Sequence, residues 1–190
     1  MDDLIIFDFD FTLAKTVEHI WIESPRGSLF QDGKLYIRLH PTEFQQLGIS
    51  DDECLNENSF KEFYSLNTEK IQIIKPVINY LKYYTDMGKV FILTARPHSL
   101  LKDVLKFLQT HNVKTKNVEY KGLTNSSFME KINWIKERIA NHKYKNIILF
   151  EDNKNIVDYL LLNKEITLGK EIYYISNFSD KTIISYYDRT

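Results

Sequence analysis

The chain has a single cysteine, Cys54, among its 190 residues, and it has no long run of apolar side chains. One cysteine cannot form an internal disulfide, and the acidic, Asn-rich stretch around it gives no reason to expect an activated thiol, so we assign Cys54 no role. No apolar run is long enough to span a bilayer, and the first apolar segment begins too close to Met1 for a secretory signal. We therefore expect a cytoplasmic protein with no membrane partner.

An excess of charge of either sign is also missing. The chain carries 25 basic and 26 acidic residues, for a net charge of -1, so the overall balance requires neither nucleic acid nor an anionic membrane as a partner. The hydrophobic content of 43%, with 14% aromatic residues, is enough for a substantial core and excludes a disordered chain. The length suits one domain with a modest insertion, and we find no internal repeat, low-complexity tract or linker.

From residue 76 onward the chain shows a regular alternation of strand and helix patterns. Apolar runs typical of strands cover 89–94, 118–120, 146–150 and 172–175, and helical patterns cover 76–86, 97–112, 128–139 and 155–162, the third of these capped by Ser126 or Ser127. Together with a first strand at 4–7, these units predict a three-layer α/β/α fold. Its helices would cover both faces of a mainly parallel, Rossmann-like sheet.

Residues 14–75 have a different pattern and are predicted to form an insertion into a core made of 1–13 and 76–190. Residues 28–39 alternate around Asp32-Gly33, which is a strong signal for a β-hairpin. A short helix is expected from Pro41 to Leu47, and a further helical segment begins at Ser59. We interpret the insertion as a flap or small cap within a single domain.

Two carboxylates follow the first apolar strand, because Asp8 and Asp10 come directly after Leu4 to Phe7. In open α/β sheets the ligand crevice lies at the carboxyl ends of the strands. Side chains two residues apart in an extended segment project the same way, so these carboxylates would share a small volume and repel each other. Such a pair favours a bound cation, although Asp is also common where strands run into turns.

Two further strands end in polar residues. Thr94 closes the strand at 89–94 and is followed by Ala95 and Arg96, and Glu151-Asp152 follows the strand at 146–150. Because the carboxyl ends of parallel strands meet at one edge of a sheet, we expect these groups to lie near Asp8 and Asp10. Hydroxyl, guanidinium and carboxylate groups are suited to phosphate or to a metal ion.

These residues resemble the motifs of the haloacid dehalogenase superfamily. The first motif, DxDxT after an apolar strand, is matched by residues 8–12, and the second, a Thr or Ser that closes a strand, by Thr94. The fourth motif, an acidic pair closing another strand, is matched by Glu151-Asp152. The resemblance covers the core of the chain, 4–13 and 76–175, and says little about residues 14–75.

The third motif of the family is a lone basic residue upstream of the last of these strands. Lys131 is our choice for it, with Lys121 as the alternative. The chain departs from the family at Phe11, where members commonly carry Gly. Phe lacks the easy access of glycine to positive φ, so we expect a turn whose conformation a Cβ tolerates.

The resemblance implies a phosphatase, a phosphoric monoester hydrolase, that works through an aspartyl-phosphate. Asp8 would be the nucleophile, and Asp10 would protonate the leaving oxygen and then activate water. Thr94 would hydrogen-bond the phosphoryl group, and Lys131 would balance its charge. Thr12, Ala95 and Arg96 would bind substrate, Arg96 by gripping a further phosphate or carboxylate unless it is an ordinary surface residue.

Mg²⁺ is the expected cofactor, because a phosphate monoester dianion resists an anionic nucleophile unless positive charge neutralises both. Mg²⁺ prefers oxygen ligands in octahedral geometry. Asp8, the backbone carbonyl of Asp10 and Asp152 would supply such ligands, and Glu151 would bind directly or through water.

The class of substrate stays open among several phosphorylated molecules. A nucleotide or the phosphorylated end of a nucleic acid ranks first, and a small metabolite and a phosphoprotein are the alternatives. Two other classes of protein also fit part of the pattern. A metal-dependent nuclease would use the acids only as ligands, with water as the nucleophile. A phosphoacceptor module such as a receiver domain would carry an adjacent acidic pair after its first strand and the phosphoacceptor Asp after a central one. This chain has the reverse order, with the adjacent acidic pair after the later strand.

Overall fold

The structure of the chain is a computed structural model that describes residues 2–41, 43–44, 55, 59–123, 128–163, 166, 168–178 and 181–189. Cys54, both candidate caps Ser126 and Ser127, and most of the helix expected from Pro41 to Leu47 lie outside these residues. Contacts between Cα atoms divide the chain into two units, one made of 1–16 with 71–190 and the other of 17–70. Each unit is described by itself.

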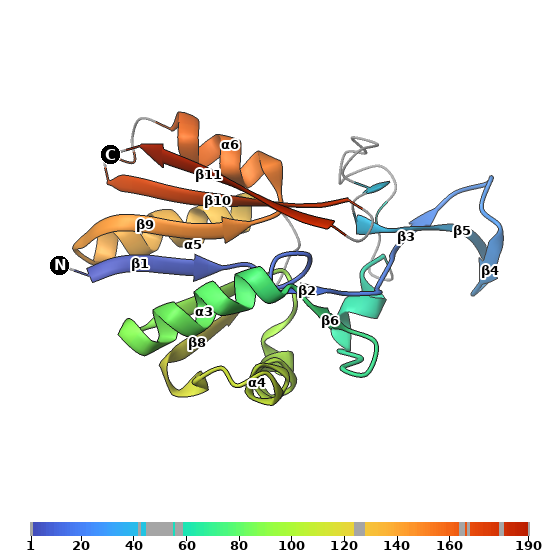
Figure 1. Cartoon of the computed structure of the whole chain (residues 1–190). Helices are drawn as coiled ribbons and strands as arrows, with labels where there is room; N and C mark the ends of the chain where they lie inside the picture. The colour runs from blue at the N-terminus through green and yellow to red at the C-terminus, as the bar shows by residue number, and fades with distance from the viewer. Residues whose placement is uncertain are drawn as a thin grey trace. The chain divides into compact units, whose positions relative to one another are not determined.

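The first unit is built on a six-stranded sheet with the order β11-β10-β9-β1-β7-β8 (Figure 1). Its strands are β1 (Asp2–Phe7), β7 (Val90–Thr94), β8 (Val118–Gly122), β9 (Tyr144–Glu151), β10 (Gly169–Phe178) and β11 (Lys181–Arg189). All neighbours pair in parallel except β10 and β11. The expectation of a mixed α/β fold with a mainly parallel sheet is therefore confirmed, whereas β11 has no counterpart in the sequence-based prediction.

Helices occupy the connections between these strands. They are α3 (Lys75–Met87), α4 (Leu101–Thr110), α5 (Phe128–Asn141) and α6 (Lys154–Leu162), with short 3₁₀ turns η2 (His98–Leu100) and η3 (Thr115–Asn117). The single helix expected over 97–112 is thus a 3₁₀ turn followed by an α-helix. A short antiparallel pair, β2 (Ala14–Lys15) with β6 (Gln72–Ile73), lies where the chain leaves and re-enters this unit.

The side chains of β1 alternate between the two faces of the sheet, as a strand requires. Leu4 and Ile6 are buried in an apolar cluster that includes Ile132 of α5 and Ile156 of α6. Fully burying an aliphatic side chain of this size contributes roughly 1.5–3 kcal/mol. The register of β1, and with it the position of the residue after Phe7, is therefore held by the core.

The other face of β1 packs against α3 through aromatic rings. The ring of Phe7 stacks on Phe150 of β9 with a centroid distance of 4.2 Å, and its edge meets Tyr84 of α3 at 6.2 Å. Figure 1 shows α3 in front of the sheet and α5 behind it. None of the helices in the described part of the chain combines the length and hydrophobicity that a bilayer-spanning helix needs.

The second unit contains a three-stranded antiparallel sheet with the order β3-β5-β4 and a 3₁₀ turn, η1 (Lys61–Tyr64). Its strands are β3 (Ile20–Glu23), β4 (Leu29–Gln31) and β5 (Lys34–Leu39). Asp32 and Gly33 connect β4 to β5 with φ values of 52° and 80°, the sign that a two-residue hairpin turn requires at both positions. The hairpin predicted around Asp32-Gly33 is confirmed.

Candidate active site

The candidate site lies at the carboxyl edge of the sheet in the first unit. Numbered along the chain, the five parallel strands lie in the order 3-2-1-4-5, in which the direction of winding reverses between β1 and β9. Ligands of open α/β sheets bind outside the carboxyl ends of the strands at such a reversal. Phe7 pairs with Phe150 at this point, and the backbone N–H of Asp8 donates to the carbonyl of Phe150 at 2.9 Å.

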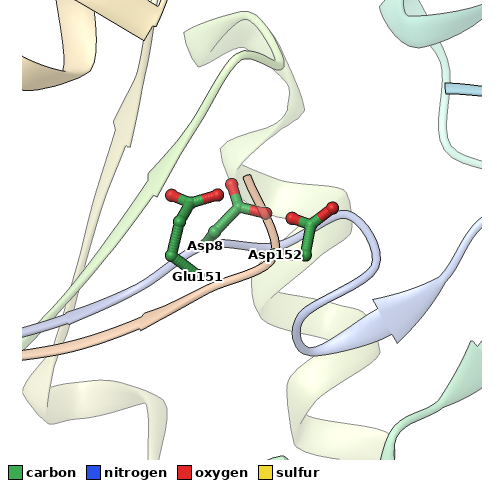
Figure 2. A group of neighbouring side chains, drawn as sticks. All are labelled: Asp8, Glu151 and Asp152. Carbon is green, nitrogen blue, oxygen red and sulfur yellow. The ribbon is translucent and has the colours of Figure 1, made fainter. Parts of the chain in front are cut away.

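Three carboxylates meet at this reversal point. One carboxylate oxygen from each of Asp8, Glu151 and Asp152 lies within 4.8 Å of the other two, and Figure 2 shows the three groups directed to the same side of the backbone. Asp8 and Glu151 are buried, and Asp152 is partly exposed. In the part of the chain that the structure describes, these residues are the one group of acidic, His or Cys side chains with the spacing of a metal site.

A single buried lysine joins two of these acids. Lys131, near the start of α5, donates from Nζ to Oδ1 of Asp8 at 2.6 Å and to Oε2 of Glu151 at 2.9 Å. Only 7% of Lys131 is exposed, whereas Lys121 on β8 is an exposed residue. Of the two lysines considered from the sequence, the structure brings Lys131 to the carboxylates.

The charges in this group are out of balance. Burial raises the pKa of Asp8 to about 7, an effect that Lys131 opposes and that Glu151 and Asp10 reinforce. Burial and the nearby charges of Asp8 and Glu151 also raise the pKa of Asp152 well above its usual value. Burial disfavours the charged form of Lys131, but the two acids outweigh it and raise the pKa of Lys131. Three carboxylates with one cation suit a further positive ion, and an all-oxygen donor set suits Mg²⁺.

The two threonines of the predicted site are both fully buried. Thr12 donates from Oγ1 to Oδ1 of Asp152 at 3.3 Å, and thereby links the turn after β1 to the end of β9. Thr94 accepts a hydrogen bond at Oγ1 from the backbone N–H of Arg96 at 3.2 Å. Ala95, which follows Thr94 in the sequence, is exposed. Contacts of Thr12 and Ala95 with a substrate stay a prediction.

Arg96 is directed to Asp10. Its side chain is fully buried, and Nε lies 3.1 Å from Oδ1 and 3.0 Å from Oδ2 of Asp10, while Nη2 lies 2.8 Å from Oδ1. Thr16 adds a hydrogen bond from Oγ1 to Oδ1 of Asp10 at 2.8 Å. The sequence did not single out Thr16, because a threonine six residues after an aspartate carries no signal by itself. The grip of Arg96 on a substrate phosphate remains a prediction, and in this structure the guanidinium binds a protein carboxylate.

The turn after β1 has a backbone conformation that the sequence did not predict. Phe11 has a φ of 58°, in the left-handed region, although a turn free of that penalty was expected for a residue with a Cβ. The left-handed conformation costs a non-glycine residue roughly 1–2 kcal/mol. The turn is closed by hydrogen bonds from Phe11 N–H to the Ala14 carbonyl at 2.7 Å and from the Leu13 and Ala14 N–H groups to the Phe9 carbonyl at 3.0 Å. Burial of the Phe11 side chain, of which 5% is exposed, offsets the cost.

Comparisons of the chain with protein-family models, with curated proteins and with solved structures find no match. The chemistry open to the site therefore follows from its own residues. These are an acidic trio joined by a buried lysine, and beside it an aspartate held by a buried arginine.

Proposed function

We propose that this protein is a Mg²⁺-dependent phosphatase of the haloacid dehalogenase type, which transfers the phosphoryl group of a monoester to Asp8 and then to water. The observation that carries the proposal is the buried contact of Asp8 with Lys131 beside Glu151 and Asp152, where the winding of the sheet reverses. The proposal includes a three-layer α/β/α core of that family. Contacts of α3 with one face of β1, and of α5 and α6 with the other, support it.

The carboxylates account for the choice of cofactor. Asp8, Asp152 and Glu151 would hold Mg²⁺, together with the backbone carbonyl of Asp10. When bound, the ion supplies positive charge to the oxygens of the phosphoryl group and to the nucleophile. Lys131 holds the carboxylate of Asp8 in one orientation and carries the only buried positive charge that contacts it among the described residues.

The reaction would proceed in two displacements. A carboxylate oxygen of Asp8 forms a bond to phosphorus while the bond from phosphorus to the ester oxygen breaks, and Asp10 gives its proton to the departing oxygen. Asp10 then takes a proton from water, whose oxygen attacks the same phosphorus and releases inorganic phosphate from Asp8. Thr94, at the end of β7, would hydrogen-bond the phosphoryl oxygens during both steps.

The proposed substrate is a nucleotide or the phosphorylated end of a nucleic acid. A small phosphorylated metabolite and a phosphoprotein would be handled by the same chemistry, because the two displacements involve only the phosphoryl group and the ester oxygen. A nuclease would instead use water as the nucleophile and would form no bond to Asp8. A phosphoacceptor module would form that bond but would turn over no substrate.

The test combines a substrate screen with two variants. Release of phosphate is measured with Mg²⁺ from nucleotides, phosphorylated oligonucleotides, sugar phosphates and phosphopeptides, for the natural chain, for Asp8→Asn and for Asp103→Asn. Asp103 is an exposed residue of α4 and provides the matched substitution. We expect Asp8→Asn to lose at least about 1000-fold in kcat, and Asp103→Asn to keep full activity.

Binding of beryllium fluoride, a mimic of a phosphoryl group on a carboxylate, separates the phosphatase from the nuclease, and turnover in the substrate screen separates it from the phosphoacceptor module. The proposed phosphatase binds it with Mg²⁺ at Asp8, and Asp8→Asn abolishes the binding. Cleavage of internal phosphodiester bonds without such binding would indicate the nuclease. Full phosphatase activity of Asp8→Asn would show that the nucleophile is wrongly assigned.

A further inference from the structure

Among the charged residues that the structure describes, Arg96 is the most deeply buried, and its guanidinium is directed at the carboxylate of Asp10. Arg96 and Asp10 lie 86 residues apart in the sequence, and their ion pair at 2.8 Å joins the loop after β7 to the turn after β1. Nε reaches both oxygens of Asp10, so the planar guanidinium fixes the plane of the carboxylate as well as its distance. A lysine could not do this, because its ammonium group is a single point of charge.

The hydrogen bonds on Asp10 are distributed unequally between its two oxygens. Oδ1 receives the short bonds from Nη2 of Arg96 and from Oγ1 of Thr16, both at 2.8 Å, while Oδ2 receives Nε of Arg96 at 3.0 Å. The side chain of Asp10 keeps 15% of its surface exposed. Both oxygens are thus held, but Oδ1 receives more and shorter hydrogen bonds than Oδ2, so Oδ2 is the better candidate for exchanging a proton with a substrate.

Arg96 is itself held in place by β8. The hydroxyl of Tyr120 donates to the carbonyls of Arg96 at 3.3 Å and of Pro97 at 3.1 Å. A Cβ on Gly122 would lie 2.5 Å from the Arg96 carbonyl oxygen, so the strand approaches this loop as closely as glycine allows. The guanidinium also lies over the ring of Phe9, 5.7 Å from its centroid. The loop can hold Arg96, and through it Asp10, in one position.

In place of the substrate contact expected from the sequence, we propose that Arg96 is a positioning residue, which orients the carboxylate of Asp10 for proton transfer to the leaving oxygen and does not itself contact the substrate. This inference rests on the proposed phosphatase function, in which Asp10 is the proton donor. When the bond from phosphorus to the ester oxygen breaks, its electron pair goes to that oxygen, which takes the proton of Asp10. Proton donors must come within about 2.6–3.2 Å of the accepting atom, and a misplacement of about 1 Å costs on the order of 100-fold in rate.

The proposal predicts a loss that depends on the leaving group. An alkoxide is a poor leaving group and needs the proton, whereas 4-nitrophenolate is stable enough to leave without it. The parameter kcat/KM covers the steps up to the departure of the leaving group, so later hydrolysis of the aspartyl-phosphate does not affect it. Arg96→Lys should therefore impair an alkyl phosphate and spare an aryl phosphate.

The experiment compares 4-nitrobenzyl phosphate with 4-nitrophenyl phosphate, which have nearly the same size and differ in the leaving group. We expect Arg96→Lys to lower kcat/KM about 100-fold for the benzyl ester and less than about 5-fold for the phenyl ester. Arg26→Lys, the same change at an exposed residue of the second unit, should alter neither. In an Asp10→Asn background, Arg96→Lys should have less than about a 3-fold further effect, because Arg96 acts through Asp10.

Each outcome decides between the inference and its premise. If the natural chain releases phosphate from neither these esters nor any monoester of the substrate screen, the proposed function fails and the inference fails with it. If the natural chain is active and Arg96→Lys affects both leaving-group classes equally, the positioning role alone is wrong. An equal rise in KM for both esters at unchanged kcat would assign Arg96 to substrate binding instead.

A second variant covers the case in which Arg96→Lys does not fold, as judged by circular dichroism. Thr16→Val removes one hydrogen bond to Asp10 and leaves the buried ion pair intact. We expect it to lower kcat/KM about 5-fold for the benzyl ester only, which corresponds to the typical worth of one hydrogen bond. A folded Thr16→Val protein with no selective loss would overturn the proposal.

Discussion

Replacing Lys131 with Met tests whether one buried cation holds the carboxylates together. Methionine has nearly the length and helix propensity of lysine, so α5 keeps its backbone and its packing while the positive charge disappears. Asp8 and Glu151 then lose the donor that lies 2.6 Å and 2.9 Å from their oxygens. Two buried acids are left close to each other without a counterion.

The Lys131→Met substitution is expected to lower the free energy of unfolding substantially, because Lys131 is buried. Removing one partner of a buried ion pair costs roughly 3–5 kcal/mol. For a chain of this length, each 1 kcal/mol lowers the melting temperature by about 2–4 °C, so we expect a fall on the order of 10 °C. The loss should be smaller at about pH 5 than at about pH 8, because Asp8, whose pKa burial raises to about 7, is neutral at the lower pH and leaves less uncompensated charge.

Thermal unfolding in EDTA at the two pH values measures this effect without interference from divalent ions. Lys121→Met is the matched control, because Lys121 is exposed, and it should change the free energy of unfolding by less than about 0.5 kcal/mol. Equal losses for the two variants would refute the reasoning. So would a loss for Lys131→Met that is larger at the acidic pH.

Three further predictions concern pH, the loop after β7 and the turn after β1. The metal-free protein should lose stability as the pH rises from about 4 to about 7. Burial raises the pKa of Asp8 from its ordinary 3.8 to about 7 in the folded chain, so its stabilising contribution is full below the lower value and is lost as the pH passes through the higher one. Melting curves in EDTA check this, and a curve that is flat with pH, or no gain on adding Mg²⁺ at the alkaline end, would contradict it. Gly122→Ala places a Cβ 2.5 Å from backbone atoms of Arg96 and His98, so we expect at least about a 10-fold fall in phosphatase kcat/KM; unchanged kinetics would mean that the loop adapts freely. Phe11→Gly relieves about 1–2 kcal/mol of backbone strain but loses a buried ring worth about 3–5 kcal/mol, and chemical denaturation should show a net loss of about 2 kcal/mol; a gain would mean that strain outweighs burial.

Much of the sheet could be predicted because its strands are buried on both faces. The runs ending at Phe7, Thr94 and Phe150 are nearly continuous apolar segments, and a parallel sheet covered by helices requires that composition. The hairpin at Asp32-Gly33 was predictable for another local reason, since few residue pairs accept positive φ twice in succession. Strand β11 was missed because it forms an edge, where one side of the backbone is unpaired within the sheet and polar residues interrupt the apolar pattern.

The sequence by itself determined which chemical groups follow the strands and that the parallel strands bring them to one edge, because burial and strand direction are written in local residue patterns. Only the tertiary structure decided between Lys131 and Lys121, which are chemically identical until the direction of α5 brings one of them to Asp8. The same holds for Arg96 and Asp10, whose pairing depends on the distance between two loops and on the close approach of Gly122. Partners of buried charges are selected through space, and no local pattern encodes the distances that make the selection.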